Sequence, residues 1–442
     1  MLKTFILGGV HPEEHKLSAG VAIRELPVPE QVVVPFGQNL GAPSKPVVKR
    51  GEKVKAGQLI AEASSFISAN VHAPVSGTIS KIDNVMDVSG YKRPCAVITV
   101  EGNEWEEEID LSETLVTKED YTAQEIIEKV KKAGIVGMGG ATFPTHIKLM
   151  VPKGKKAEYL IINGVECEPY LTSDHRLMLE KGEEILVGIR LLMIALGVEK
   201  AMIGIENNKP DAIEYLTTLS KKYKGITVHA LKVKYPQGGE KQLIKALTNR
   251  EVPSGKLPVE VGCVVQNVGT AFAVYEAVQK NKPLIDRVVT VTGKAVKTPS
   301  NFKVRIGTPV RNLIEAAGGL PENTGMIING GPMMGKALIN PDVPIVKGSS
   351  GILILEDEFA SRPIENPCIR CSKCTNVCPM GLEPYLLSRL ARTKHYAEAE
   401  KENIMDCIEC GSCQYTCPAD IPLLDYLRLG KSKVGEIIRK RN

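Results

Sequence analysis

Residues 368–379 read CIRCSKCTNVCP, and residues 407–418 read CIECGSCQYTCP. These stretches are one motif, C-x2-C-x2-C-x3-C-P, and they hold eight of the eleven cysteines. Three thiolates on one tight loop can hold three irons of a [4Fe–4S] cluster, and the proline after the fourth cysteine is typical of such sites. The repeat therefore predicts two [4Fe–4S] clusters in the last quarter of the chain.

The spacing also predicts which thiols share a cluster. In proteins with two clusters, the fourth cysteine of each run ligates the cluster of the other run. The first predicted set is Cys368, Cys371, Cys374 and Cys417, and the second is Cys407, Cys410, Cys413 and Cys378. Disulfides and zinc are the alternative interpretations. Zinc sites usually pair two C-x2-C knuckles and have no use for a third and fourth cysteine followed by proline.

The chain as a whole has the composition of a soluble globular protein. Its 442 residues are too many for one core and indicate two to four domains. A net charge of +5 and a single tryptophan give no sign of nucleic-acid binding. Thiols in cluster spacing favour a reducing cytoplasm. The longest apolar stretch, residues 185–198, contains Arg190 and is too short to span a bilayer, so we expect any membrane role to be peripheral.

Residues 1–110 are expected to form a barrel-sandwich domain. The stretches 46–61 and 72–79 contain short alternating runs with glycine turns, which favour β-hairpins. They resemble the barrel-sandwich domain of lipoyl and biotinyl carriers. Such carriers have a modifiable lysine at a hairpin tip, whereas no lysine lies between Lys55 and Lys81. We therefore expect a rigid docking or packing domain without a swinging arm.

Residues 111–284 are expected to form an α/β domain. From residue 158 to residue 280 the chain alternates between strand and helix patterns, which predicts a largely parallel sheet covered by helices. The strands are expected at 159–162, 201–205 and 227–233, and the helices at 183–196, 210–220, 239–247 and 270–279. Three polar, glycine-containing turns follow apolar strands, at 163–169, 235–240 and 266–270. Ligands in such sheets bind at the carboxyl ends of the strands, so these turns are candidate walls of one cofactor pocket.

A glycine-rich loop precedes these strands. Residues 137–148 read GMGGATFPTHIK, and such glycines let backbone N–H groups approach a phosphate or a flavin closely. The next region, residues 285–360, predicts a small α+β domain. In the last region, residues 361–442, each cysteine run leads into a helix, expected at 382–395 and 423–438.

Several of these stretches resemble known families. Residues 137–148 resemble the flavin loop G-R-G-G-A-G-F-P-T-G-L-K of the NADH-oxidising flavoprotein subunit of respiratory complex I. Residues 163–169 resemble its N-A-D-E-S-E-P, residues 264–270 resemble its V-V-N-N-V-E-T, and the region after residue 285 resembles its SLBB domain. The order of a barrel-sandwich hybrid, a Rossmann-like flavin domain, a β-grasp SLBB domain and a helical two-cluster ferredoxin domain resembles the C subunit of the Rnf complex.

The resemblance implies non-covalently bound FMN and NAD(H) as the substrate, beside the two clusters. It places FMN contacts at Gly137, Gly139, Gly140, Lys148, Asn163, Glu166, Glu240, Gln266, Asn267 and Thr270. It also places Glu168 and Phe143 near the nicotinamide. The chain departs from complex I at Met138, Val165 and Thr142, where complex I has arginine, aspartate and glycine.

The same resemblance implies an oxidoreductase and translocase subunit on the cytoplasmic side of the cell inner membrane. Its partners would be other subunits of a membrane-bound Rnf-type complex, including a ferredoxin-like iron–sulfur subunit, with ferredoxin as an indirect partner and no nucleic acid. Flavin beside two clusters suits conversion between a hydride and single electrons. Two alternatives remain: an NADH-dependent cobalamin reductase of a bacterial microcompartment, and a non-catalytic iron–sulfur wiring and docking subunit.

Overall fold

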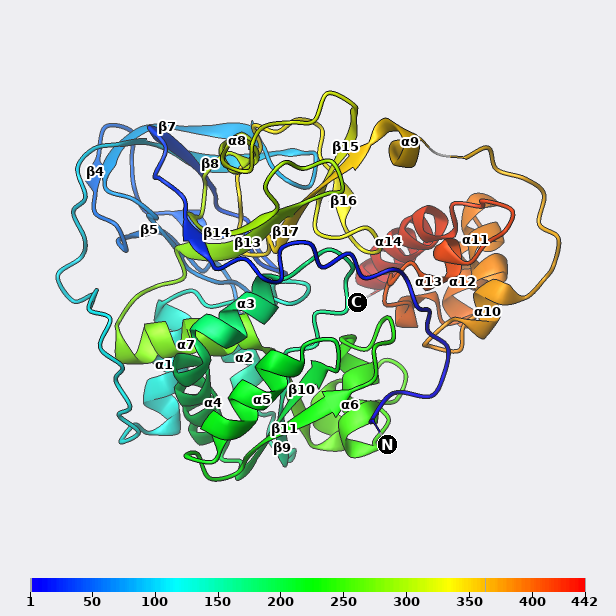
Figure 1. Cartoon of the computed structure of the whole chain (residues 1–442), viewed down its shortest axis with the longest axis horizontal. Helices are drawn as coiled ribbons and strands as arrows, with labels where there is room; N and C mark the ends of the chain where they lie inside the picture. The colour runs from blue at the N-terminus through cyan, green and yellow to red at the C-terminus, as the bar shows by residue number, and fades with distance from the viewer. Residues whose placement is uncertain (1, 362, 442) are drawn as a thin grey trace.

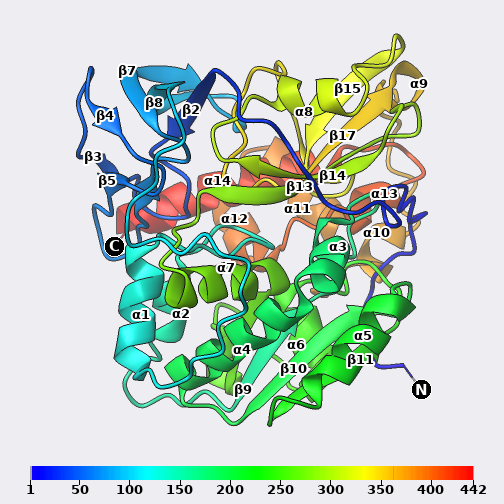
Figure 2. The same cartoon turned by 60° about the vertical axis from the view of Figure 1, so that its left-hand side comes forward.

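The computed structural model describes residues 2–361 and 363–441, so residues 1, 362 and 442 of the predicted terminal domains lie outside the description. Four domains follow one another along the chain. Figures 1 and 2 show the barrel-sandwich strands and a small α+β domain on one side and an α/β domain on the opposite side. The cysteine-rich helices, orange to red, lie beside both (Figure 1). This is the multidomain α/β and α+β organisation that the sequence predicts.

The barrel-sandwich domain consists of two small sheets around one apolar core. The larger sheet has the order β2-β8-β7-β4 and the smaller has the order β3-β5-β6. Their bounds are β2 (Gln31–Pro35), β3 (Lys45–Pro46), β4 (Lys53–Val54), β5 (Leu59–Glu62), β6 (Val71–His72), β7 (Gly77–Met86) and β8 (Lys92–Val100). Val32 and Val34 of β2 and Ile60 of β5 are fully buried in this core, because alternate residues of a strand point to one face.

The α/β domain contains a parallel four-stranded sheet with the order β11-β10-β9-β12. The strands are β9 (Tyr159–Asn163), β10 (Lys200–Glu206), β11 (Ile226–Leu231) and β12 (Cys263–Asn267). The strand order reverses between β9 and β12, which makes this the switch point of the sheet. In open α/β sheets, ligands bind beyond the carboxyl ends of the strands at that point.

Helices cover both faces of this sheet (Figure 2). They are α1 (Ala123–Lys132), α2 (Thr145–Leu149), α3 (Ser173–Glu180), α4 (Gly182–Leu196), α5 (Pro210–Ser220), α6 (Glu240–Thr248) and α7 (Val268–Gln279). Leu160 and Ile162 of β9 join the core formed with α1, α4 and α7, whereas Ile161 joins the core formed with α6. A sheet buried on both faces explains why these strands read as continuous apolar runs.

The small α+β domain is built on a six-stranded sheet with the order β1-β14-β13-β17-β15-β16. Its elements are β13 (Asp286–Thr292), β14 (Ser300–Arg305), α8 (Val310–Ala316), β15 (Thr324–Asn329), β16 (Lys336–Ala337) and β17 (Gly351–Glu356). The buried residues Val310, Leu313 and Ile314 of α8 pack on this sheet. The first strand, β1 (Arg24–Glu25), comes from the far amino-terminal end of the chain.

The cysteine-rich domain is helical. It contains α10 (Lys373–Asn376), α11 (Pro384–Arg392), α12 (Tyr396–Lys401), α13 (Ser412–Tyr415) and α14 (Leu423–Arg441), after the short α9 (Asp357–Ala360). The helix predicted over 382–395 ends earlier, at Arg392, because Lys394 has a φ of 60° and cannot continue a right-handed helix. A separate helix then starts at Tyr396.

Residues 2–25, which the predicted first domain includes, lie outside the two sheets of the barrel-sandwich. They cross the other domains, as the dark blue segment in Figure 1 shows. Val10 pairs with Tyr235 of the α/β domain, and the Gly9 N–H donates to the Val377 carbonyl of the cysteine-rich domain at 2.9 Å. A segment without a hairpin partner of its own satisfies its backbone groups on neighbouring domains.

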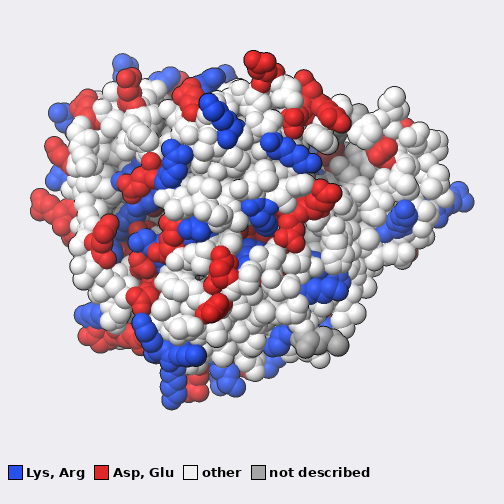
Figure 3. Space-filling model, in the orientation of Figure 1, with Lys and Arg blue, Asp and Glu red and all other residues white. Residues whose placement is uncertain are grey.

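A buried lysine holds three domains together. The Lys347 side chain is 1% exposed, and its Nζ donates to the carbonyls of Asn70 and Gly134 at 2.6 and 2.7 Å. Burial lowers the pKa of Lys347 to about 7. On the surface, Figure 3 shows acidic and basic side chains interspersed over the viewed face, in keeping with the modest net charge.

Candidate functional site

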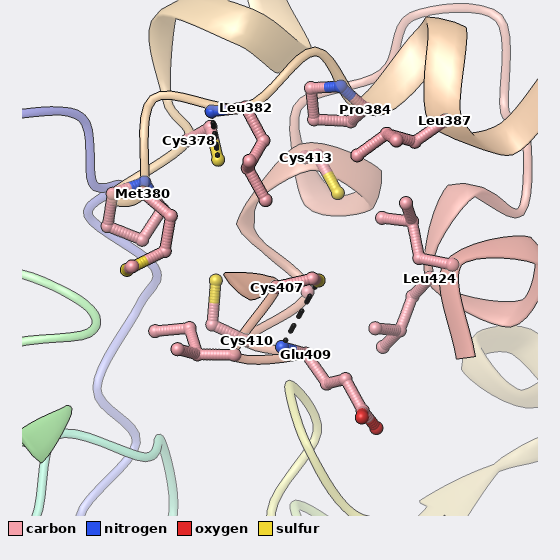
Figure 4. A pocket seen from close by; sticks show the side chains of 14 residues that line it. Cys378, Met380, Leu382, Pro384, Leu387, Cys407, Glu409, Cys410, Cys413 and Leu424 are labelled. Carbon is pink, nitrogen blue, oxygen red and sulfur yellow. Dashed lines mark hydrogen bonds between the residues drawn. The ribbon is translucent and has the colours of Figure 1, made fainter. Parts of the chain in front are cut away.

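Thiols from both cysteine runs line one pocket of the cysteine-rich domain. Cys407, Cys410 and Cys413 line it together with Cys378, the fourth cysteine of the first run. Figure 4 shows these four side chains around a common space, with apolar side chains such as Leu382 completing the wall. The structure thus brings together the second crossed set of thiols that the repeat predicts, which we call the proximal site.

The proximal site fits a [4Fe–4S] cluster. Its four thiols surround a common space that apolar side chains otherwise line. Burial raises the pKa of Cys407 to about 11, and it also raises the pKa of Cys410 and Cys413. Cluster binding would therefore release protons from these thiols.

The other four cysteines form a more open set, which we call the distal site: Cys368, Cys371, Cys374 and Cys417. Cys368 and Cys371 are exposed, and Cys374 and Cys417 are half-buried. Burial, and to a smaller extent the neighbouring Cys417 thiol, raises the pKa of Cys374. Cys374 and Cys417 both pack against the apolar core of the cysteine-rich domain. Their joint ligation of a cluster at the distal site stays a prediction.

The two cysteine runs share one backbone conformation. Arg370 and Ser372 in the first run have φ angles of 57° and 58°, and their equivalents Glu409 and Gly411 have φ angles of 55° and 77°. The short helices α10 and α13 then start at matching positions. Successive backbone N–H groups in such conformations form concavities that suit anionic groups, including iron–sulfur sites.

The proximal site packs directly against the α/β domain. The Tyr235 hydroxyl donates to the Cys410 carbonyl at 2.8 Å, and both residues share a buried apolar cluster with Met333 of the small α+β domain. The Gln242 side chain donates to the Pro379 carbonyl at 3.1 Å. Sequence reasoning marked the turn that starts at Tyr235 but missed this contact, because a tyrosine before a proline–glycine turn carries no sign of its partner.

The predicted FMN residues gather at the switch point of the sheet. Asn163 ends β9 and Asn267 ends β12, and the two are paired in register. The Asn163 amide donates to the Gly238 carbonyl at 2.9 Å, and the Asn267 Oδ1 accepts the Gly269 N–H at 2.8 Å, which caps α7. Residues from three separate stretches of the chain therefore meet at the ends of these two strands.

The glycine-rich loop lies on the start of α7. The Met138 N–H donates to the Thr270 hydroxyl at 3.0 Å. A Cβ atom at Gly139 would approach the Asn267 side chain to 2.9 Å, whereas one at Gly140 would meet no atom within 4 Å. A side chain at position 139 would thus crowd Asn267, whereas Gly140 borders open space where a ligand can approach the backbone.

Two further observations bear on the fit to FMN. The Gln266 side chain is 3% exposed, and its Nε2 has no hydrogen-bond partner among the described residues. A buried amide donor without a partner is unfavourable unless a ligand accepts from it. Lys148 forms an ion pair with Glu240 at 3.0 Å and donates to the Val265 carbonyl at 3.2 Å. These residues fit a polar cofactor at the end of β12.

Glu166 has a structural role besides the predicted one. Its carboxylate accepts the N–H groups of Asp174 and His175 at 2.7 and 3.1 Å, at the start of α3. Such a carboxylate stabilises the helix terminus. The neighbouring Val165, where complex I has aspartate, is fully buried, and its carbonyl accepts a hydrogen bond from the Lys209 Nζ at 2.8 Å.

The structure places the two predicted nicotinamide residues in different surroundings. Glu168 contacts the turn before β16: its Oε1 accepts the N–H groups of Met333 and Met334 at 2.9 and 2.8 Å. Burial raises the pKa of this carboxyl. Phe143 is half-buried at the end of the glycine-rich loop, where its carbonyl accepts the Gly137 N–H at 2.8 Å.

Family comparisons divide the chain in the same way. Residues 4–103 match the RnfC barrel sandwich hybrid domain and residues 130–276 match the Nuo51 FMN-binding domain. Residues 288–337 match the SLBB domain and residues 362–418 match the 4Fe-4S dicluster domain.

Relatives match the chain over nearly its whole length. The C subunit of the proton-translocating ferredoxin:NAD(+) oxidoreductase complex of Clostridium ljungdahlii is 48% identical over 98% of this chain and 94% of its own length. The Na(+)-translocating counterpart of Acetobacterium woodii is 44% identical over 98% of both chains. The C subunit of the ion-translocating oxidoreductase complex of Rhodobacter capsulatus is 43% identical over 98% of this chain and 83% of its own length.

An FMN-binding α/β domain joined to a dicluster domain defines a flavin and iron–sulfur electron-transfer protein. The chain belongs to the family of C subunits of Rnf-type ion-translocating oxidoreductase complexes. This confirms the predicted family, the fold class, and FMN and [4Fe–4S] clusters as cofactors. The domain boundaries and the individual ligand residues stay predictions. No helix in the described part of the chain has both the length and the apolar character of a membrane span.

Proposed function

We propose that this subunit passes electrons between NAD(H) and a one-electron partner of a membrane-bound ferredoxin:NAD+ oxidoreductase complex. Two relatives are named for that reaction. FMN, when bound, exchanges a hydride with NAD(H) and single electrons with iron–sulfur clusters. The protein supplies binding, orientation and electrostatic surroundings at three sites: the FMN pocket, the proximal site and the distal site.

The contact between the proximal site and the α/β domain carries this proposal. Tyr235 belongs to the turn beside the predicted FMN residues, and its hydroxyl binds the Cys410 backbone at 2.8 Å. The distal thiols Cys368 and Cys371 are exposed instead. This supports the order FMN, proximal site, distal site and redox partner. Neither direction of electron flow is favoured by this order.

Residues of the pocket would hold FMN and substrate in a fixed geometry. The backbone of Gly140 and the amide of Gln266 would donate to FMN, and Lys148 would face its polar groups. Phe143 and Glu168 would border the nicotinamide of NAD(H). The buried cluster of Tyr235, Met333 and Cys410 would exclude water between the pocket and the proximal site.

The exposed distal site supports docking of a separate iron–sulfur protein, because a one-electron donor must approach a cluster closely. We place the subunit on the cytoplasmic side of the inner membrane as a peripheral part of the complex. Ion translocation would be performed by membrane-spanning partners.

Anaerobic purification with iron, sulfide and flavin assays tests this function. We expect about eight irons per chain, stoichiometric FMN, and visible absorbance that NADH bleaches. A reconstituted protein that holds both clusters and FMN but never bleaches with NADH would refute the role in NAD(H) oxidation. A protein that holds clusters but never binds FMN would support the wiring subunit instead.

A further inference from the structure

A buried arginine from the small α+β domain reaches the glycine-rich loop of the α/β domain. Arg287 lies near the start of β13 and is 8% exposed. Its Nε donates to the Ser349 carbonyl at 3.1 Å, and its Nη1 lies 2.7 Å from the Met138 sulfur. Both partners are uncharged, so neither contact neutralises the guanidinium.

The carboxylates near Arg287 are engaged elsewhere. Asp286 pairs with Lys282 at 2.7 Å and with Arg305 at 3.4 Å, and Asp174 accepts from Asn267 at 2.6 Å. In the part of the chain that the structure describes, no acidic side chain lies within ion-pair distance of Arg287. Burial lowers the pKa of Arg287, and the carboxylates of Asp174 and Asp286 act in the opposite direction. A buried cation of this kind is stabilised by an anionic ligand.

The surroundings of Arg287 suit a phosphate. Its Nη1 lies 3.6 Å from the place where a Cβ atom on Gly269 would stand, so it is next to the first turn of α7. The same turn receives the Met138 N–H through Thr270. Backbone N–H groups of a helix start and a glycine-rich loop bind phosphate oxygens, and an arginine fork adds charge and two parallel donors.

We propose that Arg287 binds the phosphate group of FMN and so makes the small α+β domain part of the flavin site. The cation reaches the glycine-rich loop at Met138. This inference rests on the proposed FMN pocket. It adds a residue from another domain, at a position that no glycine-rich motif would indicate.

Riboflavin lacks the phosphate group of FMN, so comparing the two ligands distinguishes a phosphate contact from a general effect on the pocket. The change is Arg287→Met in the full-length protein, with flavin removed and each ligand added back during fluorescence titration. We expect FMN to bind about 10- to 100-fold more weakly, the range for loss of a charge-assisted hydrogen bond. Riboflavin binding should change by less than about threefold. Equal weakening of both ligands, or no weakening of either, would overturn the proposal.

Two further variants keep the test decisive. Arg305→Met removes a cation from the adjacent strand that is paired with Asp286, so the ratio of FMN to riboflavin affinity should stay as in the parent protein. The double variant Met138→Arg with Arg287→Met moves the positive charge from position 287 to position 138, which it contacts. We expect this double variant to bind FMN at least tenfold more tightly than Arg287→Met alone. If Arg287→Met does not fold, Arg287→Lys and the double variant carry the same comparison, and failure of the double variant to favour FMN over riboflavin would refute the proposal.

The phosphate could also come from the pyrophosphate of NAD(H). In that case Arg287→Met would raise the KM for NADH and leave FMN affinity unchanged, a result that contradicts the assignment to FMN. A parent protein that binds no FMN at all would refute the proposed pocket itself, which is a separate outcome.

Discussion

Exchange of the fourth cysteines between the two clusters can be tested by replacing each one separately. Cys378 belongs by sequence to the first run, but it lines the cavity formed with Cys407, Cys410 and Cys413. Cys378→Ser should therefore remove the cluster of the proximal site. Cys417→Ser should remove the cluster of the distal site and leave the proximal one intact.

The expected magnitude follows from the two ligand sets. Each variant should lose about four of about eight irons per chain, so iron content alone does not distinguish them. Reduction by NADH does, because the proximal site is the one that contacts the α/β domain through Tyr235. Anaerobic NADH should still reduce one cluster in Cys417→Ser. In Cys378→Ser it should reduce FMN but neither cluster, although dithionite should still reduce the remaining one.

Each variant serves as the matched control of the other, since both change one thiol to a hydroxyl in equivalent positions of the repeat. Electron paramagnetic resonance of the reduced proteins would record which cluster is left. The reverse pattern, with NADH-reducible iron in Cys378→Ser and none in Cys417→Ser, would refute crossed ligation and support two independent runs.

Three more changes test other parts of the structure. Gly411→Ala should destabilise the protein by about 1–3 kcal/mol more than Gly197→Ala, as measured by thermal unfolding. Both glycines have positive φ, but only a Cβ atom at Gly411 would collide with a neighbour, at 2.7 Å from the Met333 carbonyl oxygen. Equal losses of stability in the two variants would contradict this contact. The pKa of Lys347 is about 7 in the folded protein and 10.5 in the unfolded chain, so the unfolded chain binds more protons between these two pH values. The contribution of neutral Lys347 to stability is therefore complete above pH 10.5 and is lost as the pH falls to 7. Between pH 7 and 10.5 the free energy of unfolding of the parent protein, relative to that of Lys347→Met, should thus rise by about 1.4 kcal/mol per pH unit. A difference in denaturant midpoint between the two proteins that does not change with pH would rule out this pKa. Glu168→Ala should cost about 1–3 kcal/mol by leaving two N–H groups without an acceptor, whereas Glu168→Gln keeps an acceptor and should cost less than half of that in the same assay.

Local pattern was sufficient where the interacting groups are close in the chain. The cysteine repeat predicted two clusters because three ligands of each lie within seven residues, and the strand–helix alternation of residues 159–279 predicted a parallel sheet. The polar turns after the strands predicted a cofactor pocket at the carboxyl ends of the strands, because these ends share one edge; its ligand residues stay predictions. Helix limits were less certain: the helix expected to reach residue 395 stops at Arg392.

The sequence did not predict contacts between segments that are far apart in the chain, because no local pattern marks them. Residues 2–25 pair with strands of the other domains, and nothing local tells an extended segment which sheet edge it will meet. The same holds for the partners of Tyr235 and Arg287, which no local pattern indicated. Each acquires its role from a partner more than 100 residues away.

The sequence by itself therefore determined the kind of chemistry: two clusters, a flavin pocket and the order of the domains, all of which depend on residue types at short spacing. Tertiary structure alone decided which thiols surround the proximal cavity, which cysteine run faces the α/β domain, and which buried cation borders the glycine-rich loop. These depend on how the four domains pack together, and burial and charge compensation at their interfaces arise only when the domains are in contact.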